Sequence, residues 1–98
     1  VPKGKAQDVV QASKEAGAGG GTVLYGRGTG VHEAKKIFGI SIDPEKEIVL
    51  TVVAERERAT ITEAIVEQNK LNEPGNGLTF ALPLTSLSGM VHLTDGGT

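Results

Sequence analysis

Small side chains recur at helical spacing near the start of the chain. Between Lys5 and Ala16 one face of the pattern holds small residues, and Gly17 stands where a glycine commonly ends a helix. The pattern predicts a helix over Lys5–Ala16 that can lie close against a sheet. The positions on that face are Ala6, Val9, Val10, Ser13 and Ala16.

Three apolar stretches predict β-strands. The first runs from Thr22 to Tyr25 and can extend to Arg27. The second, Ile48–Ala54, is β-branched and apolar at consecutive positions, which is typical of a central strand buried on both faces. The third, Leu78–Leu82, alternates in polarity and predicts a half-buried strand.

A second helix is expected after the central strand. Thr60 and Glu63 have the spacing of a capping box, so the helix should begin at Thr60 and run to about Lys70. The charged residues 55–58 before it predict a solvated turn. The run 72–77, which contains Gly75-Asn76-Gly77, predicts a tight turn after it.

The segment from Val31 to Glu47 permits two interpretations. Val31, Ala34 and Phe38 share a helical face, which favours a short helix packed on the sheet. The segment is also long for a loop, and loops of this length in compact domains are usually functional or mobile.

These elements give the order α-β-loop-β-α-β within one α+β domain, residues 1–98. A strand before Lys5 would complete the βαββαβ order of the ferredoxin-like fold, an antiparallel sheet with two helices on one face. Val1 and Pro2 resemble the end of such a strand, so we expect the first strand to be cut off here.

Composition narrows the function classes. The formal net charge is -2 and aromatic residues make up 3%, which disfavours nucleic-acid partners and base stacking. The chain contains no cysteine, no apolar run long enough to span a membrane and no signal-peptide pattern, so a cytoplasmic location is expected. A domain of this size buries only roughly two-thirds of its unfolded surface, so self-association would help its stability.

No catalytic motif is complete. Gly26-Arg27-Gly28-Thr29-Gly30 lacks the third glycine of a dinucleotide fingerprint, and no Walker A sequence occurs. His32 and Glu33 are sequence neighbours without a second histidine at helical spacing, so no metal site is expected. The serines have no histidine or lysine at a spacing that would indicate a nucleophile.

Glycine clusters remain as candidate chemistry. Half of the 14 glycines fall between residues 17 and 30, and Gly28–Gly30 follows a strand while Gly75–Gly77 precedes one. Backbone amides in such turns can form an anion-binding nest if the two turns converge. The alternative is that they are ordinary tight turns.

The ordered set of these residues resembles the P-II nitrogen-regulatory signalling family. The resemblance rests on Gly20-Gly21-Thr22-Val23 entering a strand, on Gly28-Thr29-Gly30 at its end and on Pro44 before the apolar strand. It rests also on the run from Gly75 to Pro83, GNGLTFALP, which is similar to the family's Gly-Asp-Gly-Lys-Ile-Phe-Val-Leu-Pro.

The resemblance implies a trimer of ferredoxin-like protomers that binds adenine nucleotides in clefts between protomers, a sensor rather than an enzyme. The loop from Val31 to Glu47 would contact a target transporter or enzyme, with Lys35, Lys36, Ile37 and Phe38 as the contact residues. The implied nucleotide contacts are Gly28, Thr29 and Gly30; Gly75, Asn76, Gly77 and Leu78; and, donated by a neighbouring protomer, Gly20, Gly21 and Thr22.

Departures from the family pattern modify this expectation. Leu78 stands where the family has a phosphate-binding lysine, Gly89 and Val91 stand where it has arginines, and His32 replaces its glutamine. Extra phosphates are best held by cationic side chains, so AMP or ADP should bind at least as well as ATP. Arg27, Lys46 and Lys70 could replace the missing cationic side chains, provided that the fold brings them near the phosphates. The alternative is a trimeric interaction scaffold that binds no nucleotide.

Overall fold

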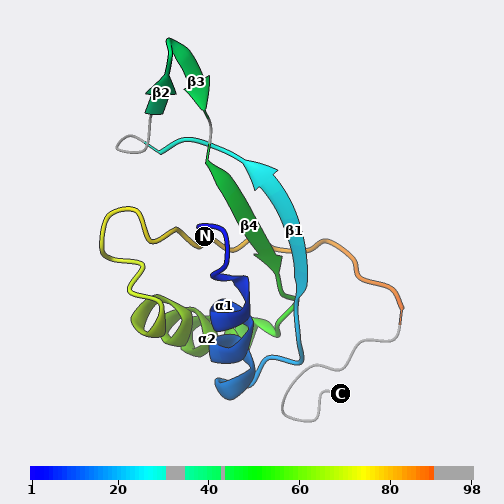
Figure 1. Cartoon of the computed structure of the whole chain (residues 1–98). Coiled ribbons are helices and arrows are strands. Elements are labelled where there is room, and N and C mark those ends of the chain that lie inside the picture. Colours follow the sequence, from blue (N-terminus) through cyan, green and yellow to red (C-terminus); the bar gives the residue numbers. More distant parts are fainter. Residues whose placement is uncertain (31–34, 43, 90–98) are drawn as a thin grey trace.

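The structure is a computed structural model of residues 1–98, and it describes residues 1–30, 35–42 and 44–89 (Figure 1). In these ranges the chain is an α+β protein in which two helices lie side by side and the first of them packs against an antiparallel strand pair. The elements are α1 Ala6–Glu15, β1 Thr22–Arg27, β2 Lys35–Ile37, β3 Ile40–Ile42, β4 Glu45–Leu50 and α2 Glu55–Gln68.

Helix α1 confirms the prediction from small side chains. Ala6, Val9 and Ala12 are buried, and Ser13 is fully buried with its hydroxyl donating to the Val10 carbonyl at 2.8 Å. The helix ends in a Schellman motif: Gly17 N–H donates to Lys14 O at 3.1 Å and Ala18 N–H to Ser13 O at 2.9 Å. Gly17 has φ +119°, the conformation that this motif requires. The rest of the core is Ala18, Ala54 and Ile61.

Strand β1 pairs antiparallel with β4, and the pairing sets the limits of β4. The ladder runs from Arg27 opposite Glu45 to Thr22 opposite Leu50. The predicted strand Ile48–Ala54 is therefore wrong at both ends. It begins three residues earlier because β1 extends to Arg27, and its ladder ends at Leu50 because the glycines before Thr22 leave the pair.

Helix α2 begins at Glu55, so the capping box predicted at Thr60 is wrong. Ala54 occupies the N-cap with extended backbone and no capping side chain, and Glu57 N–H donates to its carbonyl at 2.9 Å. Glu55 and Glu57 place negative charge in the first turn, where the helix dipole favours it. Residues 55–58, predicted as a turn, are the first turn of this helix.

The segment 31–47 contains a β-hairpin instead of the short helix. Strands β2 and β3 pair antiparallel, with Ile37 opposite Ile40, and Phe38 and Gly39 form the two-residue turn at φ +52° and +79°. The helix interpretation is wrong for residues 35–38, while 31–34 and Asp43 lie outside the described residues. Residues 45–47, assigned to the loop from sequence, belong to β4.

The turn at 72–77 is confirmed, but the strand after it is not. Asn76 N–H donates to Glu73 O at 3.3 Å, and the Asn76 carboxamide donates to Lys70 O at 3.0 Å. Leu78–Leu82 pairs with no strand within the described part of the chain, and its Leu78, Phe80 and Leu82 side chains are exposed. A strand requires a neighbour, and the sequence pattern alone cannot supply one.

We predict that Lys70→Gly stabilises the protein. Lys70 has φ +52° at the C-terminal end of α2, where Leu71 N–H donates to Val66 O at 3.0 Å in a second Schellman motif. Glycine adopts this left-handed conformation without the steric cost that a Cβ imposes, so the substitution should raise the free energy of unfolding by about 0.5–1 kcal/mol. Thermal melting measures the effect, with Lys14→Gly inside α1 as a control of opposite sign. An unchanged or lower melting temperature for Lys70→Gly would contradict the prediction.

A second prediction concerns an exposed ion pair, Lys3 Nζ to Glu45 Oε2 at 2.8 Å. The hydrogen bond and the charge of Lys3 lower the pKa of Glu45 from its ordinary 4.5, and Glu45 raises the pKa of Lys3 from 10.5. The contribution of the ion pair to the stability of the fold is therefore complete between pH 4.5 and pH 10.5. It is lost as acid protonates Glu45 below pH 4.5. In a carboxyl NMR titration, Lys3→Met should raise the Glu45 midpoint, and Lys14→Met should leave it unchanged. A midpoint at or above 4.5 in the unmodified protein would refute this.

Candidate functional site

The two glycine turns singled out by the sequence meet at one cavity. The cavity has a volume of about 400 Å³ and lies beside the start of β4. We call it the glycine cavity. It is lined by Val1, Gly28, Thr29, Gly30, Lys46, Glu47, Ile48, Gly75, Gly77 and Leu78.

Backbone pairing along β4 holds both turns in place. The Val1 nitrogen donates to Glu47 O at 2.9 Å, and Glu47 N–H returns a bond to Val1 O at 2.9 Å. Gly77 packs directly on Val1, because a Cβ built on Gly77 would lie 2.8 Å from Val1 Cγ1. On the other side, Gly28 N–H donates to Pro44 O at 3.1 Å. The first glycine turn is thus fixed just before the start of β4, and the second is fixed through Val1 on the edge of β4 that β1 does not occupy.

Glu47 also joins the cavity to helix α1. Its Oε1 accepts a hydrogen bond from Ala6 N–H at 2.8 Å. The first N–H groups of a helix have no partner within it, so the carboxylate satisfies one of them and complements the positive end of the helix dipole. The negative charge of Glu47 is therefore engaged at the start of α1, and Lys46 contributes a positive charge to the cavity wall.

The glycines leave room for an approach to the backbone. A Cβ at Gly28 or Gly75 would meet no atom within 4 Å. The Gly28 N–H is already paired with Pro44, so Gly28 offers close approach and not a donor. Gly75 and Gly77 have φ +84° and +123°, which places their turn in a conformation that favours glycine.

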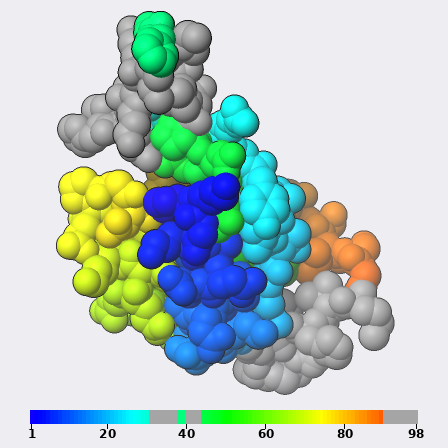
Figure 2. Space-filling view, in the orientation of Figure 1, coloured from blue at the N-terminus to red at the C-terminus, as the bar shows by residue number. Residues whose placement is uncertain are grey.

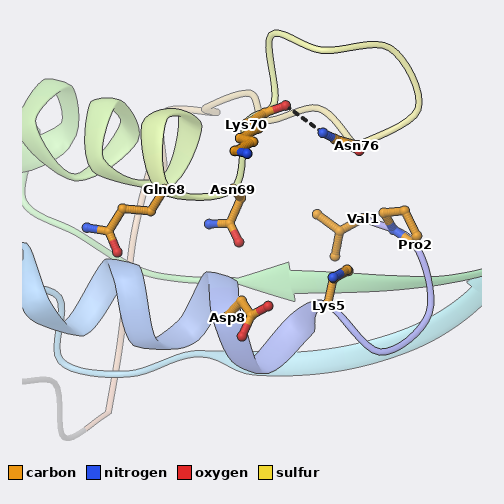
Figure 3. A pocket seen from close by; sticks show the side chains of 8 residues that line it. All are labelled: Val1, Pro2, Lys5, Asp8, Gln68, Asn69, Lys70 and Asn76. Atoms are coloured by element: carbon orange, nitrogen blue, oxygen red, sulfur yellow. Dashed lines mark hydrogen bonds between the residues drawn. The ribbon is translucent and has the colours of Figure 1, made fainter.

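The structure brings together most of the nucleotide contacts expected from the resemblance, but not all of them. Gly28, Thr29, Gly30, Gly75, Gly77 and Leu78 all line the glycine cavity. Asn76 does not, because its carboxamide turns away to the Lys70 carbonyl at 3.0 Å (Figure 3). The run 20–22 lies at the opposite end of β1, roughly 20 Å along the strand from Gly28. It cannot reach the cavity of its own chain.

The residues expected to contact a partner lie elsewhere. Lys35, Lys36 and Ile37 form β2, and Phe38 stands at the hairpin turn. Figure 1 shows this hairpin beyond the far end of the β1–β4 pair from the helices. The glycine cavity and the hairpin tip are therefore two separate surfaces.

The sequence alone did not indicate Val1, Glu47 or Ile48 as site residues, and it indicated Lys46 only as a cation that the fold could bring near. The register that sets Lys46 opposite Gly26 is what brings these residues to the cavity. The periodicity of a single strand carries no information about register, so no signal in the sequence could have placed them. Of the other two cations considered, Lys70 lines a different cavity and Arg27 lines neither.

A smaller cavity of about 280 Å³ lies on the other side of Val1, between the start of α1 and the end of α2 (Figure 3). Its wall is mixed polar and apolar, and it includes two lysines of like charge and one carboxylate. The lining residues are Val1, Pro2, Lys5, Asp8, Gln68, Asn69, Lys70 and Asn76.

Among the described residues, no group of three His, Asp or Glu side chains is placed to hold a metal ion.

One face of the strand pair carries exposed apolar side chains. Leu24 and Ile48 face each other across the ladder and are 45% and 46% exposed. Leu50, the last residue of β4, and Val52, just beyond the strand, continue the exposed row. Leu78, 74% exposed, shares the glycine cavity with Ile48. We call the row of Leu24, Ile48, Leu50 and Val52 the outer face.

No helix within the described ranges is long and apolar enough to cross a lipid bilayer.

Comparison with known proteins identifies no relative. No protein-family model, no curated protein and no solved structure matches this chain.

Proposed function

We propose that the chain is a P-II-like signalling protein that binds an adenine nucleotide at the glycine cavity. The observation that carries the proposal is the meeting of Gly28–Gly30 with Gly75 and Gly77 in one cavity. These turns lie about 45 residues apart in the sequence. Two unrelated tight turns would not be expected to share one cavity.

The chemistry of the cavity suits a nucleotide. Its volume of about 400 Å³ lies within the range of small-molecule sites, roughly 300–1,000 Å³. Backbone N–H groups in glycine turns can donate hydrogen bonds to phosphate oxygens, and Lys46 adds a positive charge. Ile48 and Leu78 supply apolar surface for a base. The proposed activity is sensing, with no catalytic step and no metal.

The cavity wall limits the charge that it can hold. The charged side chains among the described lining residues are Lys46 and Glu47, so they give the wall no net positive charge, and Leu78 adds none. Each further phosphate adds negative charge that a lysine or arginine would best neutralise. We therefore infer that AMP or ADP binds at least as well as ATP.

The proposed complete fold is ferredoxin-like, βαββαβ. Pro2 forms an antiparallel bridge with Lys46, on the edge of β4 that β1 does not occupy. This is where the first strand of such a sheet would pair, and 78–82 would add the last strand. The bridge supports the expectation that Val1 and Pro2 end a strand.

A trimer would explain both the outer face and the position of residues 20–22. Exposed apolar rows of this kind mark association surfaces. Within one chain Gly20, Gly21 and Thr22 lie far from the cavity, whereas a neighbouring copy can present them to it. The proposal therefore has the nucleotide held between protomers, in the cytoplasm, with a transporter or enzyme as the regulated partner.

One observation favours the alternative, a trimeric scaffold without nucleotide. Among the described residues that line the cavity, Lys46 is the only lysine or arginine, and an exposed Leu78 stands where the family has a phosphate-binding lysine. The scaffold and the sensor share the trimer and the partner contact. They differ only in whether the glycine cavity is occupied.

Calorimetry with AMP, ADP and ATP tests the sensor. We expect AMP or ADP to bind at least as tightly as ATP. Gly28→Ala should weaken binding at least about tenfold, because its methyl group meets nothing in the free protein but blocks close approach. Gly26→Ala, two residues earlier, within β1 and outside the cavity, is the matched control.

Two results would count against the sensor. Tight ATP binding with AMP and ADP undetectable would reverse the charge argument, and no binding of any of the three would leave the scaffold. Gly77 is not a suitable test site, although the sequence singles it out. Any side chain there would collide with Val1 at 2.8 Å, so the turn itself would move.

We predict a trimer in solution, with three times the 10.1 kDa mass of the chain. Leu50→Glu on the outer face should shift the protein toward monomer, because it would bury a charge between protomers. Light scattering at micromolar concentration measures both, with Glu63→Lys on the exposed surface of α2 as the control. A monomer mass for the unmodified protein would remove the trimer from the proposal.

A further inference from the structure

Phe38 occupies an unfavourable position for its side chain. It is 98% exposed, the highest value among the exposed large hydrophobic residues of the described chain. It also has φ +52°, in the left-handed region, at the first position of the two-residue turn. Gly39 follows with φ +79°, and positive φ at both positions is the pattern of a type I′ turn.

The turn itself does not need phenylalanine. Type I′ turns favour asparagine, aspartate or glycine at this position, because a bulky side chain is unfavourable at positive φ. The phenyl ring also gains no burial in the free protein, since nearly all of its surface faces solvent. Asparagine adopts positive φ more readily and is polar, which suits an exposed position, so the stability of the free chain does not account for Phe38.

The ring is presented at the end of a projecting element. Figure 1 shows the β2–β3 hairpin beyond the β1–β4 pair, and Figure 2 shows the tip segment, in green, at the extremity of the molecule. Residues 35–42 contain Lys35 and Lys36 and no acidic residue, although the whole chain has a net charge of -2. The hairpin is thus a basic element with an apolar tip on an acidic protein.

We propose that Phe38 is an aromatic anchor that inserts into an apolar pocket of a partner protein, and that acidic side chains surround this pocket. A single buried aromatic residue can dominate the energy of a protein interface. The acidic rim complements the two lysines of the hairpin. The inference deepens the partner contact of the proposed function, and it does not depend on nucleotide binding.

A lipid surface is the less favoured occupant. Stable attachment to a bilayer takes a cluster of basic residues or several apolar insertions, and the described hairpin has two lysines and one phenylalanine at its tip. A preformed protein pocket needs only one well-placed ring. The two occupants are distinguished by the experiment.

The experiment uses two substitutions, one expected to weaken partner binding and one expected to retain it. Phe38→Asn should leave the melting temperature unchanged or raise it, because asparagine suits the turn. The same change should weaken partner binding about tenfold or more. Phe38→Tyr keeps the ring and should retain binding close to that of the unmodified protein.

The partner is obtained with a photoreactive p-benzoylphenylalanine at position 38, compared with the same group at exposed position 14 on α1. A protein captured from position 38 alone is then purified and titrated with the unmodified protein, Phe38→Asn and Phe38→Tyr. The expected result is the loss of affinity in Phe38→Asn and its retention in Phe38→Tyr. Capture alone does not support the proposal.

Four results would overturn it. These are no adduct at position 38 beyond that at position 14, equal affinity of Phe38→Asn, a lower melting temperature for Phe38→Asn, and Phe38-dependent binding to phosphatidylcholine–phosphatidylglycerol vesicles. The last result would assign the tip to a lipid surface. Nucleotide titration of Phe38→Asn separates this proposal from the sensor, since the glycine cavity should bind AMP and ADP unchanged in that variant.

Discussion

The backbone pairing of Val1 with Glu47 is the contact on which the candidate site depends. It fixes the start of the chain to β4 through two hydrogen bonds of 2.9 Å. Gly77 can pack at that position only because it has no side chain, and the Glu47 carboxylate satisfies the first N–H of α1 from the same residue. One residue of β4 therefore connects the chain start, a helix and the turn that forms half of the glycine cavity.

The small core makes these backbone contacts more important. The buried side chains of the described ranges are mostly alanines, with Val9 and Ile61 as the larger apolar members. Meanwhile Leu24, Ile48, Leu50 and Phe80 keep much of their surface in contact with solvent. Removal of apolar surface from water is the main favourable contribution to folding, and a single copy of the chain leaves much apolar surface exposed. Association through the outer face would use it.

Features fixed by local backbone chemistry were predictable from the sequence. Gly17 marked the end of α1, and Gly75 and Gly77 marked their turn, because positive φ depends on the residue itself. Features that depend on a neighbouring strand were not predictable from the sequence. The limits of β4 follow from its register with β1, and 78–82 has the pattern of a strand without a paired neighbour in the described part of the chain. The start of α2 at Glu55 was missed because Ala54 provides no capping side chain. The hairpin turn was missed because Phe38 stands before Gly39 at the position where such turns favour asparagine, aspartate or glycine.

The site and the hairpin share the end of the β1–β4 pair. Gly28 lines the glycine cavity, and its N–H donates to Pro44, just before β4 and shortly after the hairpin strand β3. A ligand against Gly28 would therefore touch the backbone contact that closes the base of the segment carrying Phe38. Ligands shift a conformational equilibrium only by the difference in their affinity for its two states. In the proposed sensor, the Gly28–Pro44 hydrogen bond is the place where such a difference can arise, because the cavity wall and the hairpin base meet there.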